Sequence, residues 1–178
     1  MKIKSCLAGL LVAGACLLVL TSFLSATEKR ISGESLRGID AIYVYVEPLS
    51  PDIEKLGLNS TILKNDVVVK LESAGIRTMS RDRWLREEGS PYLDVMIRVL
   101  ALADAKEFIY SIDIAFRQNV YPLRIAVEIS GASTWSTGGV IGITPNLEKI
   151  RKSLRDQTDL FINSFLSINP GYKRAVEE

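Results

Sequence analysis

Residues 93–117 read LDVMIRVLALADAKEFIYSIDIAFR, and this stretch decides the fold. Apolar side chains alternate with polar or smaller ones before and after the polar segment 104–106, as in strands that each bury one face. The same alternation returns over residues 124–129, after a polar join at 118–119. Short joins favour antiparallel neighbours, so we expect an antiparallel meander of three strands.

A strand–helix–strand unit is expected before the meander. Residues 39–46 (IDAIYVYV) are rich in the β-branched and aromatic side chains that strands prefer. Apolar side chains then recur at helical spacing between Asn59, a good helix cap, and Gly75, which ends helices at little cost. Residues 76–79 supply a short second strand, which predicts a parallel βαβ unit with a right-handed crossover.

The last element is predicted to be a long amphipathic helix. Thr144 is the expected cap, Pro145 the first helical residue, and residues 169–171 (NPG) the end. Apolar side chains at steps of three and four trace one face over residues 147–168, which needs the apolar face of the meander as its partner. We therefore predict an α+β fold: a mixed sheet of about five strands (one βαβ unit plus an antiparallel meander), with two main helices packed on one face.

Residues 1–26 have the three parts of a secretory signal: a basic start, an apolar stretch from Cys6 to Leu20, and small residues before a cut after Ala26. The stretch is near the lower length limit of a membrane span, so an uncleaved anchor is one alternative. A lipoprotein acylated at Cys16, which follows three small residues, is the other. The expected location is the periplasm or the outside of the cell, and membrane contact requires that the segment be retained or Cys16 acylated.

The predicted organisation is a signal peptide or membrane anchor at 1–26, a linker at 27–37, a single α+β domain at 38–170 and a C-terminal tail at 171–178. Removing residues 1–26 leaves 152 of the 178 residues, enough to bury a core without disulfides. It also removes Lys2 and Lys4, leaving 20 basic against 21 acidic side chains. This balance argues against a nucleic-acid partner, which requires a basic face.

Several chemistries are excluded by composition. The chain has no histidine, and both of its cysteines lie within the first 26 residues. The exported part therefore has no thiolate nucleophile, no Ser-His-Asp triad and no Cys/His zinc site. We expect no enzyme, no metal and no cofactor. Catalysis by paired carboxylates or a Ser/Lys pair is a third hypothesis, although no spacing in the sequence nominates a pair.

Three groups of residues are candidates for an interaction surface. Tyr43 and Tyr45 share one face of the first strand, and would pack under helices in a central strand or form an aromatic patch at an edge. Arg83 and Trp84 lie in a run of mixed charge, as a binding hot spot or as an anchored, solvated helix. The glycine loop before the last helix is a hinge or an anion site, and its candidates are Gly138, Gly139 and Gly142.

Two further interpretations concern the strands. Trp135 has the phase of the apolar strand residues, which predicts a core position under the last helix. The charged residues of the less apolar strand face are expected to be solvated, and some could pair across strands. They are Asp94, Arg98, Asp113, Arg117, Arg124 and Glu128.

The helix end at 71–76 (LESAGI), followed by a short strand, resembles the amino-terminal domain of TolB-type proteins and LptE-type α+β domains. Thr134-Trp135, a glycine loop, residues 161–163 (FIN) and residues 169–170 (NP) resemble uncharacterised small exported bacterial envelope proteins. The resemblance implies a small α+β envelope protein and assigns no site residue.

The predicted function is therefore that of a non-catalytic exported envelope protein. It would act as a protein-binding or assembly module whose partner is another envelope protein, met through an uncovered sheet face or edge. The alternative is a periplasmic carrier of a small or lipidic ligand, held between the sheet and the helix at 147–168.

Overall fold

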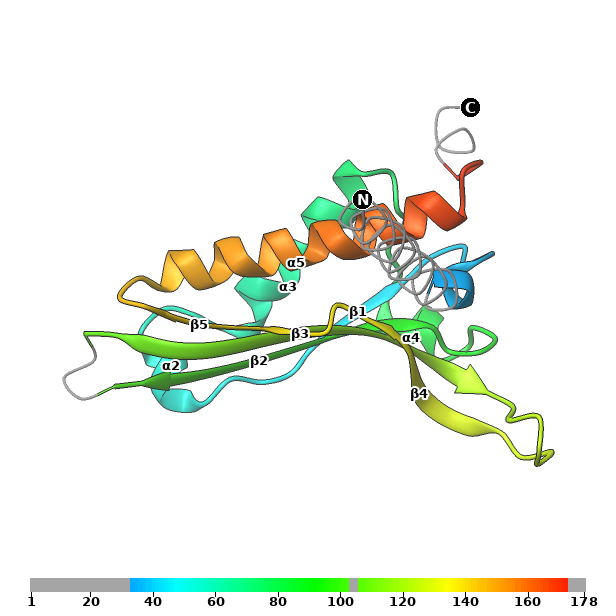
Figure 1. The fold of residues 1–178 in the computed structure, drawn as a ribbon, viewed down its shortest axis with the longest axis horizontal. Coiled ribbons are helices and arrows are strands. Elements are labelled where there is room, and N and C mark those ends of the chain that lie inside the picture. The colour runs from blue at the N-terminus through cyan, green and yellow to red at the C-terminus, as the bar shows by residue number, and fades with distance from the viewer. Residues whose placement is uncertain (1–32, 103–105, 173–178) are drawn as a thin grey trace, which may run out of the picture.

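The computed structural model describes residues 33–102 and 106–172 (Figure 1). The predictions for residues 1–26, including Cys16, lie outside this part of the chain, as do residues 27–32 and 173–178. No helix within the described ranges is long and apolar enough to cross a membrane. Within the predicted linker, residues Glu34–Leu36 form the short helix η1, and Leu36 is fully buried.

The predicted mixed sheet of five strands is confirmed. The strands are β1 (Tyr43–Val46), β2 (Tyr92–Ala101), β3 (Phe108–Val120), β4 (Ile129–Ser136) and β5 (Val140–Thr144). β1 pairs with β2 in parallel, and β2 pairs with β3 antiparallel. The other edge of β3 is shared: β5 pairs with its first half and β4 with its second half, both antiparallel. β3 is therefore the centre of the sheet.

The helices are α2 (Pro51–Lys55), α3 (Ser60–Ser73), α4 (Arg81–Trp84) and α5 (Leu147–Ile168), besides η1. The two main helices, α3 and α5, lie side by side on one face of the sheet, as predicted (Figure 1). Asn59 caps α3 by accepting a hydrogen bond from the Ile62 amide at 3.0 Å. Gly75 follows the end of α3 with a positive φ of 81°, a conformation that glycine adopts without strain.

The core lies between the helices and the sheet. The inward side chains of β3 meet the apolar stripe of α5, whose Phe161 contacts Phe116 and Trp135 with ring centroids 6.2 and 5.2 Å apart. Phe116 and Phe161 are fully buried and Trp135 is 7% exposed, so the predicted core position of Trp135 is confirmed. Each such side chain contributes about 1.5–3 kcal/mol by leaving water.

The predicted strand at 124–129 is wrong. β4 begins only at Ile129 and runs to Ser136, and the predicted join at 118–119 lies inside β3. The β3–β4 pairing is shifted between Phe116 and Arg117 and again between Gln118 and Val120. Figure 1 shows this end of the hairpin bent away from the helices. Apolar and polar side chains thus alternate over residues 121–128 as in a strand. No core lies beside this segment to cover the apolar ones, so no strand forms.

Three smaller predictions also need correction. Residues 76–79 make only an isolated parallel bridge, between Ile42 and Thr78, because Gly75 and Ser80 leave room for little more. The glycine loop includes β5, since Gly138 and Gly139, with φ of 77° and 74°, let the chain return to the edge of β3. The cap of α5 is Asn146, whose side chain accepts from the Glu148 amide at 2.8 Å. Thr144 ends β5, and Pro145 precedes the helix instead of being its first residue.

Candidate binding surface

Two of the aromatic candidates from the sequence, Tyr43 and Trp84, meet on the face of the sheet opposite α3 and α5. Tyr43 of β1 stacks on Trp84 of α4 at 5.1 Å, and Trp84 meets the edge of Tyr92 at 5.5 Å. The Trp84 indole donates to the Ser90 carbonyl at 2.9 Å. Tyr43 is 9% exposed, so this group closes one end of the face by packing, whereas Tyr45 stays 41% exposed.

Arg83 lies beside this cluster in a surface ion network. Its guanidinium donates to Asp40 at 3.1 Å and to Glu87 at 3.3 Å, and Arg77 pairs with the same Asp40 carboxylate. The hydrogen bond to Asp40 raises the pKa of Arg83 above its usual value, with a further contribution from Glu87. The network joins α4 to the segment before β1, and each of its charges already has a partner.

The three candidate glycines have backbone roles. Gly138 and Gly139 form the joint between β4 and β5. Gly142 lies under the ring of Tyr110, where an added Cβ would be 2.6 Å from the ring. The Tyr110 hydroxyl is thereby placed 2.9 Å from the Ser153 hydroxyl of α5. These contacts account for the glycines through packing and chain direction.

One carboxylate predicted to be solvated is buried, and its arginine partner is half-buried. Asp94 is 6% exposed and accepts from Arg117 at 2.6 Å, and Arg117 also donates to the Gly131 carbonyl at 3.2 Å. The pair lies where the sheet bends and α4 closes the second face. Burial raises the pKa of the neighbouring Tyr92 above its usual value, with a smaller contribution from the Asp94 charge.

The rest of that face is open over β2, β3 and β5. Its exposed apolar side chains include Leu100, Ile141 and Ile143, with exposed fractions of 62%, 79% and 59%. A depression of about 510 Å³ lies between Met96, Asp113 and Ile141, and a second of about 270 Å³ lies between Leu100, Ile109 and Ile141. Both are lined by Arg98, Ser111 and Ile141. They form one groove across the three strands, which we call the open-face groove.

The groove contains two charged side chains of opposite sign. Arg98 is exposed and makes no ion pair among the described residues. Asp113 has one carboxylate oxygen that is inaccessible to water and without a hydrogen-bond donor there. A buried polar atom without a partner is costly. The groove therefore offers the guanidinium of Arg98 and the carboxylate of Asp113 beside apolar surface.

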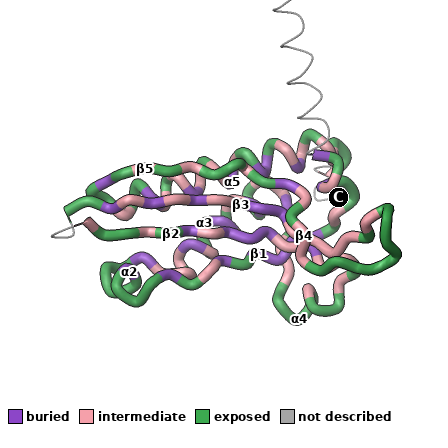
Figure 2. Tube along the Cα trace, turned by 60° about the horizontal axis from the view of Figure 1, so that its bottom comes forward, coloured by how far each residue is buried: buried purple, intermediate pink, exposed green. Residues whose placement is uncertain are grey.

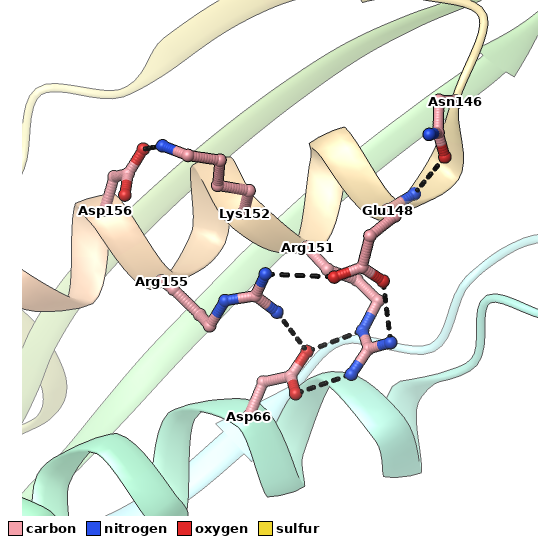
Figure 3. A network of polar contacts seen from close by, with 7 residues as sticks. All are labelled: Asp66, Asn146, Glu148, Arg151, Lys152, Arg155 and Asp156. Atoms are coloured by element: carbon pink, nitrogen blue, oxygen red, sulfur yellow. Dashed lines mark hydrogen bonds and ion pairs between the residues drawn. The ribbon is translucent and has the colours of Figure 1, made fainter.

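A second polar network was missed by the sequence analysis (Figure 3). Arg151 of α5 donates twice to the Asp66 carboxylate of α3, at 2.8 Å for each bond, and once to Glu148 at 2.8 Å. Arg155 donates to Glu148 at 2.9 Å. Asp66 raises the pKa of Arg151 above its usual value. The network fixes α3 against α5, and the sequence could not pair Asp66 with a residue 85 positions away.

The described residues contain no group of three or more acidic, histidine or cysteine side chains that could hold a metal ion. No protein-family model matches the chain, and no curated protein matches it.

Proposed function

We propose that this protein is a non-catalytic binding module of the bacterial cell envelope, which holds a protein partner in its open-face groove. The observation that carries the proposal is the groove itself, on the sheet face that neither main helix covers. Exposed patches of large apolar side chains rimmed by polar groups are typical of protein interaction sites. The predicted export of the chain supplies the compartment.

The side chains of the groove indicate which chemical groups its partner presents. Leu100 and Ile141 line the groove and favour apolar side chains on the partner, while Arg98 favours a carboxylate beside them. The Asp113 carboxylate, which lines the same groove, favours a hydrogen-bond donor or a cation on the partner. The partner is therefore expected to present an apolar segment with an acidic residue, and to gain specificity from the two charges.

The alternative of a ligand carrier has less support. Its cavity would lie between the sheet and α5, but the stripe of α5 fills this space with fully buried side chains. They are Ile150, Leu154, Thr158, Phe161 and Phe165. The apolar stripe is thus explained by the core, whereas the apolar residues of the open-face groove are not.

The test is site-specific photo-cross-linking in the cells that make the protein. A cross-linking amino acid at position 141 is expected to give one discrete protein adduct, which Arg98→Glu abolishes. The same amino acid at position 69, a valine of similar exposure on α3, is the matched control and is expected to give no such adduct. The proposal fails if position 141 gives no adduct while a known envelope complex is cross-linked efficiently.

A further inference from the structure

The bent end of the β3–β4 hairpin, residues 119–131, projects from the body as an arm (Figure 1). Figure 2 shows that the tip consists mostly of exposed residues. Large apolar side chains that a soluble body would bury are exposed there, Leu123 completely and Val127 by 60%. The complete set is Tyr121, Leu123, Ile125, Val127 and Ile129. Such a concentration of exposed apolar surface marks a contact site.

The returning half of the arm tip, residues 124–129, has a strand sequence without a strand partner. Its six side chains, RIAVEI, are all exposed. Within residues 121–128, all of which the structure describes, the one backbone hydrogen bond joins the Ile125 amide to the Pro122 carbonyl at 3.1 Å. The segment therefore offers unpaired backbone groups together with the β-branched side chains that strands favour.

The segment is complementary to itself in one register. An antiparallel pair centred on Ala126 places Arg124 opposite Glu128 of a second copy, and it does so twice because the pair is symmetric. In the same register Ile125 faces Val127, and Leu123 faces Ile129. Opposite charges and apolar side chains that face each other stabilise antiparallel pairs. A shift by one residue would place Ile125 against Glu128, and a shift by two would separate the charges.

We propose that the arm is a dimerisation element, which pairs antiparallel with the arm of a second copy in the register centred on Ala126. The contact is isologous, as in most symmetric dimers. It joins two short segments and buries little area, so the dimer is expected to form and dissociate with protein concentration. The arm and the open-face groove are separate surfaces, and one copy can use both.

A lipid surface is the competing occupant of an exposed apolar tip. The observations favour the second copy, because a bilayer requires neither the strand alternation nor charges placed symmetrically about Ala126. Unpaired backbone groups are also costly inside hydrocarbon, whereas a second strand satisfies them.

The first experiment is sedimentation velocity on the protein as it is purified from the cells that make it, without engineered truncation, over a range of protein concentrations. The wild-type chain is expected to show a reversible monomer–dimer equilibrium. Arg124→Glu is expected to weaken the dimer by about tenfold or more, because two attractive pairs become repulsive. Arg124 is exposed and makes no ion pair among the described residues, so this change is expected to leave the monomer intact. Arg86→Glu, at an exposed arginine outside the arm, is the matched control.

The charge pairing has a specific rescue. Glu128→Arg alone is also expected to weaken the dimer. An equimolar mixture of Arg124→Glu and Glu128→Arg chains is expected to regain it, since each introduced charge then faces its opposite. A chain that stays monomeric at every concentration, or a dimer indifferent to Arg124→Glu, overturns the proposal.

A second experiment tests the register. Ala126→Cys is expected to give a disulfide-linked dimer under mild oxidation, with the linkage at position 126 located by mass spectrometry. Ala101→Cys, an exposed alanine at the end of β2, is the control. Binding of the monomeric chain to phosphatidylglycerol–phosphatidylethanolamine vesicles, lost in Leu123→Asp and without any dimer, would assign the arm to lipid and overturn the proposal. Neither result bears on the open-face groove, which Arg98→Glu tests separately.

Discussion

Residues 108–116 of β3 and residues 124–129 of the arm share a pattern of alternating apolar side chains, but these side chains are buried in β3 and exposed in the arm. In β3, Phe108, Ile112 and Phe116 alternate with smaller or polar residues and are at most 5% exposed. In the arm, Ile125, Val127 and Ile129 alternate in the same way and are 43–60% exposed. Periodicity thus indicates which side chains share a face, but it does not indicate whether anything covers that face. For the arm, we propose that a second copy does.

The largest expected difference between the two regions is in stability. Phe161→Ala removes the ring that contacts Phe116 and Trp135, and we expect it to lower the free energy of unfolding by about 3–5 kcal/mol. Val127→Ala in the arm should change it by less than about 0.5 kcal/mol when the protein is monomeric. Urea denaturation at low protein concentration measures both. A loss of more than about 1 kcal/mol for Val127→Ala would exceed what exposed positions usually show, and would mean that the arm packs on the body.

A smaller contrast concerns added volume. Gly142→Ala places a methyl group against the Tyr110 ring, so we expect a loss of about 1–3 kcal/mol. Ala126→Val adds two methyl groups at the exposed arm and should cost almost nothing. Denaturation of both variants, and of Gly142→Ala combined with Tyr110→Leu, provides the measurement. The double variant should cost less than the sum of its single changes, since the second change removes the ring that the first one meets.

Most of the body could be predicted from the sequence because local rules and the core agree there. The helix limits at Asn59 and Gly75 follow from capping, and the position of Trp135 follows from strand phase. The failures lie where contacts between distant residues decide. The sequence around Thr144 predicts a helix cap, but Thr144 is the last residue of β5. This strand forms because Gly138 and Gly139 turn the chain back to β3. The open-face groove exists because the main helices cover only the other face of the sheet. No local sequence pattern indicates which face the helices cover.

The smallest expected effect is a shift in the pKa of one tyrosine in the arm. The Tyr121 hydroxyl donates to Glu128 at 3.0 Å, and this hydrogen bond, followed by the Glu128 charge, raises the pKa of Tyr121 above its usual value of about 10. The neutral phenol is therefore the form that the folded arm favours. The contact is complete below the ordinary tyrosine pKa and is lost as the pH rises through the raised one. NMR titration of the protein with labelled tyrosine measures the pKa of Tyr121. The signal of this residue is identified by its absence in Tyr121→Phe.

Glu128→Ala should return the pKa of Tyr121 to the ordinary range, while Glu54→Ala, an exposed carboxylate on α2, should leave it unchanged. An unshifted Tyr121 in the wild-type chain would mean that the tip lacks its own local structure. The register centred on Ala126 would then have to form entirely on contact with the second copy, and the dimer would be weaker by the cost of ordering two tips. A raised pKa that persists in the monomer would instead show that each tip holds Glu128 in place before the arms meet.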